Sequence, residues 1–304
     1  MGELLALIAA FGYTTQLILI RLGSEEQRRN NAMTVQLIIL TTAFILLTAI
    51  FGGNILFVPN SGLIEQFRSL TLLAFSYIAL EGLLGPLGGL FFLTKATDLI
   101  GPSKTSILRG CNPFFTTIFA IIFLGETPGI KGIFAVLLLI LGIFIISYKK
   151  EKTPVSSEAT KEQAVGLILG LMGGLAFSMA QTARGLALDA GATPNTVIYL
   201  GHITSLVVLL IIYRIYARKI NFLQYVAFRQ IKLYTLAGVS VVTANYALLS
   251  SFLLIPVWQA VAIRNLQPLL AIILSWLFLK KEELGLRIFI GAIIVVIGIW
   301  LTLI

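Results

Sequence analysis

The sequence is a succession of apolar blocks, each long enough to cross a membrane as a helix. About 20 apolar residues, rising about 1.5 Å each, span a hydrocarbon core about 30 Å thick. Only 12% of the 304 residues are charged, whereas a soluble domain carries about 25%. We therefore predict an all-α polytopic membrane protein with ten transmembrane helices. Their expected positions are about 4–20, 33–51, 69–93, 102–124, 130–148, 164–187, 194–216, 233–254, 257–279 and 287–303.

A hydrophilic stretch divides the chain into two halves of five predicted helices. We interpret KKEKTPVSSEATKEQ, residues 149–163, as a polar linker between one repeat at 1–148 and a second at 164–304. A shift of 155 residues aligns ILRGCNP (107–113) with AIRNLQP (262–268), which share an arginine, a side-chain amide and a proline. Because each half has an odd number of helices, the second repeat is expected to lie inverted relative to the first.

Basic residues are concentrated in alternate connections between the apolar blocks. The connections after the odd-numbered predicted helices, with the adjoining helix ends, hold 17 of the 22 lysines and arginines, and the other connections hold 2. Lysine and arginine are retained on the cytoplasmic side of membrane proteins. We therefore predict a multi-pass protein of the plasma or inner membrane with both termini outside the cell.

Composition also excludes several classes of function. The net charge of +9 belongs to loops that orient a membrane protein, so we expect no nucleic-acid partner. With one cysteine, Cys111, and one histidine, His202, we expect neither a disulfide framework nor a metal site. GPSKTS (101–106) lacks the glycine–lysine pair of a phosphate loop. Without a nucleotide site, transport would use a gradient of protons or another ion. We expect no cofactor. We also expect no enzyme activity, because the sequence offers no pair of a nucleophile and a base.

Two arginines occupy equivalent positions in the two halves, about seven residues into predicted helices. Arg109 and Arg264 would lie on opposite sides of the midplane, with side chains long enough to converge there. A charged residue at membrane depth indicates a functional site, although a structural ion pair or snorkelling to the interface is the alternative. Pro113 and Pro268 cannot donate to the carbonyls four residues earlier, which belong to these arginines. A kink is therefore predicted at each arginine, for a binding site or for packing alone.

Three further polar side chains accompany the arginines as candidate substrate-binding residues. Asn112 and Gln267 precede the two prolines and add donors and acceptors to the same turns. Glu81 heads the segment EGLLGPLGGL, in which glycines and a proline loosen the predicted helix. It could bind a substrate amine, relay a proton, or neutralise Arg109 or Arg264 in a static pair.

Other polar residues of the apolar blocks carry a weaker signal. Asn245 is a candidate for lining the substrate path, together with Gln16, Gln181 and His202. Each of these side chains is also typical of an interhelical hydrogen bond. Arg184 lies near the end of its predicted helix, so we expect it to snorkel to the interface.

The chain resembles the EamA-like carriers of the drug/metabolite transporter superfamily over essentially its whole length. The resemblance rests on ten helices in two halves and on a fourth helix that carries a proline and runs into FLGE (123–126). FLKKE (278–282) stands at the equivalent place in the second half. The family likeness implies export of metabolites through a cavity lined by helices 3, 4, 8 and 9. It also implies cytoplasmic termini, opposite to the charge distribution, which we follow.

Our hypothesis is a secondary transporter that exports a small polar metabolite across the bilayer by alternating access. Two guanidinium groups favour an anionic or zwitterionic substrate, because arginine binds carboxylate or phosphate through two parallel hydrogen bonds. One alternative is an exporter of cationic or apolar compounds that uses Glu81. Another is a lipid scramblase or a membrane protein that transports nothing.

Overall fold

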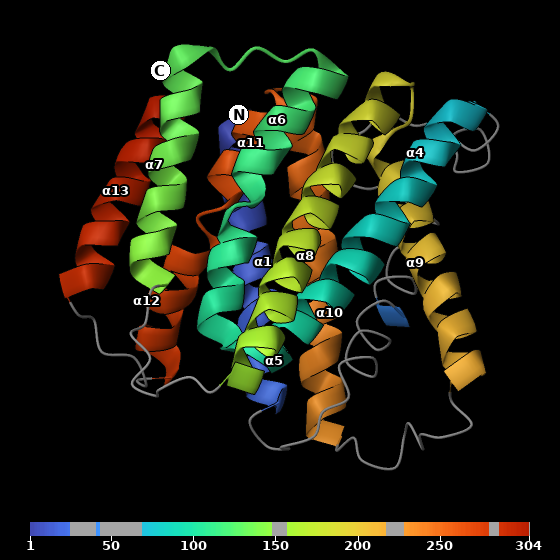
Figure 1. Ribbon diagram of the computed structural model, residues 1–304. Coiled ribbons are helices and arrows are strands. Elements are labelled where there is room, and N and C mark those ends of the chain that lie inside the picture. The colour runs from blue at the N-terminus through green and yellow to red at the C-terminus, as the bar shows by residue number, and fades with distance from the viewer. Residues whose placement is uncertain (25–40, 43–68, 148–156, 217–227, 280–285, 304) are drawn as a thin grey trace.

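The protein is a bundle of helices that stand side by side (Figure 1). In the computed structural model, all regular structure of the described residues is helical, as the apolar blocks predict. Both ends of the chain lie at the upper end of the bundle in Figure 1. The predicted helix at 33–51 falls almost wholly outside the described residues. The structure describes residues 1–24, 41–42, 69–147, 157–216, 228–279 and 286–303.

The helices fall into two groups along the chain. The first comprises α1 (Gly2–Ser24), α4 (Leu72–Gly82), the π-helix η1 (Leu83–Gly89), α5 (Leu90–Gly110), α6 (Asn112–Leu124) and α7 (Gly129–Ser147). The second comprises α8 (Ser157–Asp189), α9 (Pro194–Tyr216), α10 (Phe228–Phe252), α11 (Val257–Arg264), α12 (Gln267–Leu279) and α13 (Leu286–Leu303).

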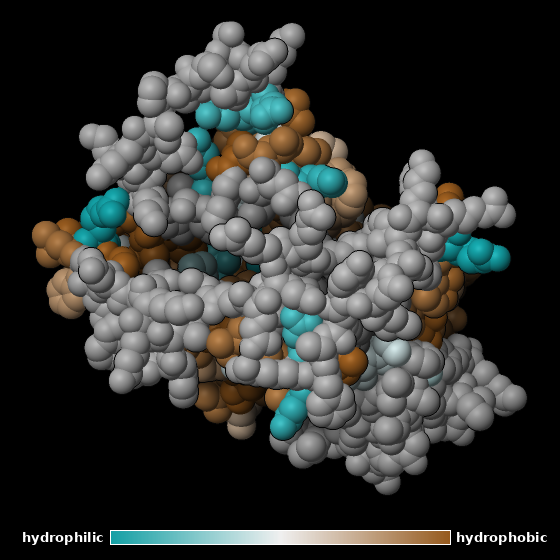
Figure 2. All heavy atoms as spheres, turned by 90° about the horizontal axis from the view of Figure 1, so that it is seen from below, coloured by the Kyte–Doolittle hydropathy of each residue, from teal (hydrophilic) through white to brown (hydrophobic). Residues whose placement is uncertain are grey.

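Membrane-spanning character is clear within the described segments. Six helices there are long and apolar enough to cross a membrane, and two shorter apolar helices accompany them, Leu108–Leu124 and Leu286–Thr302. The chain is therefore a multi-pass membrane protein, while the count of ten helices stays a prediction. Figure 2 shows the lower end of the bundle, where brown apolar and teal hydrophilic patches lie next to one another between the grey atoms.

Two connections are more helical than the sequence suggested. Helix α8 begins at Ser157, so the last part of the predicted linker at 149–163 extends this helix. Helix α5 continues through residues 94–101, where a loop was expected. Residues 157–163 are mostly good helix formers such as glutamate, lysine, alanine and glutamine, and residues 94–101 contain no proline that would end the helix. Hydrophilic residues therefore marked the edge of the membrane in these places but not the end of a helix.

Two predicted helices are broken near their prolines. The expected helix at 102–124 divides at Cys111 into α5 and α6, and the one at 257–279 divides at residues 265–266 into α11 and α12. Pro113 lies in the first turn of α6, where its missing amide hydrogen is tolerated. The amide of Cys111 instead bonds the carbonyl of Leu108 at 3.2 Å, which closes the end of α5. The predicted kinks are thus confirmed as helix breaks.

The glycine-rich segment that begins at Glu81 also departs from a regular α-helix. Residues Leu83–Gly89 form the π-helix η1, which contains Pro86. A π-helix leaves backbone groups in unusual positions and is frequent at functional sites. The local loosening predicted from the glycines and the proline is therefore found directly after Glu81.

The packing of the helices follows a regular scheme. Helix α1 packs against α10, α11 and α12, whereas α8 packs against α4, η1, α5 and α6. Helices α7 and α13 pack against each other, and they approach closely at Gly142 and Gly291. A Cβ on either glycine would lie 2.8 Å from the carbonyl oxygen of the other, so neither position has room for a side chain.

Candidate functional site

The two helix breaks meet in the interior of the bundle. Arg264, the last residue of α11, donates from Nη2 to Oδ1 of Asn112, the first residue of α6, at 3.2 Å. Beside this contact, Nδ2 of Asn265 donates to the carbonyl oxygen of Gly110 at 3.3 Å. The prolines were expected to free the carbonyl of Arg109, but the freed carbonyl that bonds across the bundle belongs to Gly110. The ends of α5 and α11, and the start of α6, are therefore tied together at one point.

Arg264 is almost completely buried and only partly hydrogen-bonded. Arg264 is 8% exposed, and its guanidinium lies 5.6 Å from the centre of the Tyr13 ring on α1. The hydroxyl of Tyr13 donates to Oδ1 of Asn245 on α10 at 2.6 Å. The Nε atom of Arg264 has no hydrogen-bond partner among the described residues. A buried guanidinium with an unused donor leaves room for an acceptor that a ligand brings.

Arg109 presents a second guanidinium close to the same point. It lies 5.7 Å from the centre of the Phe177 ring on α8 and is partly accessible. The guanidinium of Arg109 forms no hydrogen bond or ion pair with any residue that the structure describes. The charges of Arg109 and Arg264 act on each other, as expected for two cations within electrostatic range. Like charges held together without a carboxylate create a local excess of positive potential.

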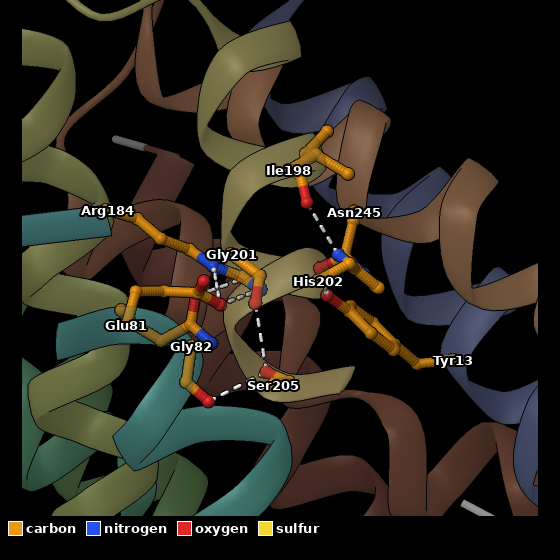
Figure 3. Close-up of polar contacts among 10 residues, drawn as sticks. Tyr13, Glu81, Gly82, Arg184, Ile198, Gly201, His202, Ser205 and Asn245 are labelled. Atoms are coloured by element: carbon orange, nitrogen blue, oxygen red, sulfur yellow. Dashed lines mark hydrogen bonds and ion pairs between the residues drawn. The ribbon is translucent and has the colours of Figure 1, made fainter. Parts of the chain in front are cut away.

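Glu81 is paired with a third arginine, shown in Figure 3. Arg184 of α8 donates to Oε1 of Glu81 from Nε at 2.9 Å and from Nη2 at 2.5 Å. Glu81 is 1% exposed and Arg184 is 5% exposed. The expectation that Glu81 neutralises Arg109 or Arg264 is therefore wrong, because its partner is Arg184. The expectation that Arg184 snorkels to the interface is wrong as well.

Hydroxyl groups fix the backbone around both arginine centres. The Oγ of Ser178 on α8 bonds the carbonyl of Asn112 at 3.0 Å, and Thr116 donates to Oδ1 of Asn112 at 3.2 Å. On the other side, Ser205 of α9 reaches the carbonyls of Gly82 at 2.8 Å and Gly201 at 2.9 Å (Figure 3). These bonds hold α8 against α6 and α9 against α4. The charged side chains therefore project from a braced framework.

The remaining candidates from the sequence lie at the edges of this arrangement or outside it. Gln267 begins α12 and is partly buried, but it joins none of these contacts. Gln181 is buried and accepts from Nη1 of Arg184 at 3.4 Å. His202 is buried, with Nδ1 at 2.7 Å from the carbonyl of Ile198. Gln16 is half-buried in α1.

Sequence reasoning gave no role to Tyr13 or Asn265, and it placed Arg184 at the membrane interface. Side chains of a helix tilt toward its N-terminus. For Arg184, close to the C-terminal end of α8, that direction leads into the bundle and toward Glu81, which could have been used to predict the pairing. Tyr13 gave no such signal, because a tyrosine within an apolar block is ordinary.

The FLGE sequence has a structural role at the upper end of the bundle. Glu126 follows α6 and accepts from the backbone amides of Val257 at 2.7 Å and Trp258 at 3.1 Å. These amides open α11, so a carboxylate of the first half of the chain caps a helix of the second half. Burial raises the pKa of the Glu126 carboxyl above its usual value, and the two amide bonds partly oppose that rise.

A Glu126→Ala protein is expected to be less stable, by about 1–3 kcal/mol, because two amides at the start of α11 lose their acceptor. The thermal unfolding midpoint in detergent measures this change. Glu162→Ala is the matched control, since Glu162 is an exposed carboxylate near the start of α8. Equal midpoints for wild type, Glu126→Ala and Glu162→Ala would contradict the capping role.

The side chains of the site are suited to binding a charged ligand. Its charged groups are three guanidiniums and one carboxylate, and the described residues contain no cluster of His, Cys, Asp or Glu able to hold a metal ion. Arginine cannot be deprotonated in a protein, so it acts as a permanent cation and hydrogen-bond donor. The arrangement is suited to holding an anion.

Comparison with known proteins agrees with a carrier. The EamA-like transporter family model matches residues 1–148 and 164–304. No curated protein matches the sequence. A solved structure titled "Crystal structure of protein" shares the fold with a TM-score of 0.72 at 12% identity, covering 99% of this chain and 95% of that chain. Because the family model matches nearly the whole sequence, the chain belongs to the EamA-like transporter family and is a membrane transporter of small molecules.

Proposed function

We propose that the protein is a secondary transporter that carries a small anionic or zwitterionic metabolite by alternating access. Arg264 and Arg109 hold the substrate, and Asn112 orients Arg264. The observation that carries the proposal is the Nε atom of Arg264, which is buried and lacks a partner among the described residues. Leaving a buried charged donor unsatisfied is unfavourable, so a site of this kind is completed by an acceptor from the ligand.

The positive charge of the buried arginines supports a negatively charged substrate. Glu81 is the only buried carboxylate of the described segments, and it already forms an ion pair with Arg184. Arg109 and Arg264 therefore have no carboxylate partner among the residues that the structure describes. A cationic substrate would meet repulsion there, which makes an exporter of cations through Glu81 the less favoured hypothesis.

The packing of the helices supports two inverted halves. In the first half, α1 contacts α10, α11 and α12; in the second, α8 contacts α4 with η1, α5 and α6. The 155-residue shift relates these two sets of neighbours to each other, because it aligns α11 with the end of α5 and α12 with α6. Rocking of one half against the other about a central site is the usual form of alternating access in such folds. We propose ten helices, both termini outside the cell, and export as the direction, which the family resemblance implies.

The test is thermal stabilisation of the detergent-purified protein by malate, glutamate, glucose 6-phosphate, choline and ethidium. A ligand present at about 100 times its Kd stabilises the folded form by about 2.7 kcal/mol. We expect stabilisation by one or more of the anions and none by the two cations. The stabilisation should vanish in Arg109→Gln, whose unliganded midpoint should stay close to that of wild type because no ion pair is broken.

Other outcomes would count against the proposal. Stabilisation by cations alone, retained in Arg109→Gln and lost in Glu81→Gln, would favour the cation exporter. A midpoint that no compound in the panel changes, combined with flipping of labelled lipids in vesicles, would favour a scramblase.

A further inference from the structure

The pair of Glu81 and Arg184 is built asymmetrically. Nε and Nη2 of Arg184 both donate to Oε1 of Glu81. Oε2 of Glu81 accepts no hydrogen bond from the described residues. Oε2 lies against the backbone of α9, where a Cβ added to Gly201 would overlap it. One carboxylate oxygen is thus fully engaged, and the other is in place to carry a proton.

The groups that face this pair come from four helices. From α8, Gln181 contacts the guanidinium of Arg184 at 3.4 Å. From α9, His202 lies within electrostatic range of Glu81, and its Nδ1 is engaged with a backbone carbonyl. From α1, the hydroxyl of Tyr13 acts on Arg184, and Asn245 of α10 holds that hydroxyl. None of these neighbours is a second carboxylate, so Arg184 alone balances the charge of Glu81.

The pair is connected to the anion site through Tyr13. The ring of Tyr13 lies under the guanidinium of Arg264, and the charges of Arg184 and Arg264 act on each other. An anion bound at Arg264 is therefore also attracted by Arg184. Arg184 then has two competing partners, the bound anion and Glu81.

We propose that Glu81 is a proton-binding site that couples the movement of the anion to the movement of a proton. When the anion attracts Arg184, the carboxylate loses its counter-charge in the interior of a membrane protein, where an unpaired charge is strongly unfavourable. The carboxylate then takes up one proton and becomes a neutral carboxylic acid, and no other bond is made or broken. On release of the anion, Arg184 returns to Glu81 and the proton leaves. Anion and proton cross together in this scheme, so export runs down the gradient of the anion itself and carries a proton outward with it. The scheme rests on the proposed function.

The experiment uses the full-length protein in liposomes that contain the pH dye pyranine. Radiolabelled malate and glucose 6-phosphate, which do not cross lipid unaided, are added outside in parallel samples. We expect uptake of at least one labelled anion, together with acidification of the lumen that a protonophore abolishes. In Glu81→Gln, exchange of labelled for unlabelled anion should persist while the acidification falls at least tenfold, because the amide still accepts from Arg184 but cannot be protonated.

Two further variants identify the group that takes the proton. Glu162→Gln is the matched control, since Glu162 is an exposed carboxylate near the start of α8, and it should behave as wild type. His202→Gln should retain the acidification. Loss of acidification in His202→Gln, with normal acidification in Glu81→Gln, would overturn the proposal in favour of the imidazole.

Uptake and acidification by the wild-type protein test the coupling even where a variant cannot be purified. Uptake of labelled anion without acidification would overturn the coupling and leave the proposed function intact. Absence of uptake and of exchange for both anions, in protein that the thermal assay shows to bind neither, would overturn the proposed function and the coupling together.

Discussion

An Arg184→Met protein is expected to lose a large part of its stability, because Glu81 must then stay buried as a carboxylate without a counter-charge or take up a proton. Removal of one partner of a buried ion pair destabilises a protein by about 3–5 kcal/mol. The whole free energy of unfolding of a domain is only about 5–15 kcal/mol. With Glu81 at 1% exposure, water cannot replace the lost guanidinium. The thermal midpoint and the yield of monodisperse protein in detergent measure the loss.

The matching double variant tests whether the loss comes from the pair itself. Glu81→Leu combined with Arg184→Met removes both charges, and replacement of a buried pair by apolar residues is often neutral or stabilising. We expect the double variant to regain most of the wild-type midpoint. Arg109→Met is the control for the loss of an arginine alone, since Arg109 makes no ion pair with the described residues. An Arg184→Met midpoint equal to that of Arg109→Met would show that the pair is not needed for folding.

The fold was predictable from the sequence because the bilayer restricts what a chain can form. Backbone groups in hydrocarbon must be bonded within the segment, so apolar blocks of spanning length become helices. Proline and glycine then indicate where the backbone is irregular. The structure has helix breaks near Pro113 and Pro268 and a π-helix around Pro86, as these residues suggested. The ends of helices were less predictable. A hydrophilic segment such as 157–163 can extend a helix into water as readily as end it.

The candidate site was predictable in its residues and less so in its partners. The repeated motif placed Arg109 and Arg264 at equivalent positions of the two halves, with Asn112 one turn from Arg109, and the structure brings Asn112 and Arg264 together. Which arginine pairs with Glu81 depends on the direction of each side chain along its helix, which spacing in the sequence does not contain. The same limit explains why the stacking of Arg264 on Tyr13 was not predicted, because it joins helices that lie far apart in the sequence.

An Arg264→Gln protein is expected to remain folded and to transport the anion poorly. Arg264 makes one hydrogen bond to Asn112 and no ion pair with the described residues, so its loss strands no carboxylate. The substrate, however, loses a charge-assisted interaction of about 1.5–3 kcal/mol, equivalent to about 10- to 100-fold in affinity. The concentration of labelled anion that gives half-maximal uptake into liposomes should rise by that factor.

Two matched variants separate the charge of Arg264 from its shape. Arg264→Lys keeps the positive charge but loses the planar fork that bonds both oxygens of a carboxylate or phosphate, so we expect an intermediate concentration at half-maximal uptake. Arg214→Gln removes an exposed arginine near the end of α9 and should leave uptake unchanged. Wild-type uptake by both Arg264→Gln and Arg109→Gln would place the substrate elsewhere in the bundle. Impaired uptake in Arg264→Gln with a normal midpoint would instead locate the anion where the two broken helices meet, because Nε of Arg264, which has no partner among the described residues, lies there.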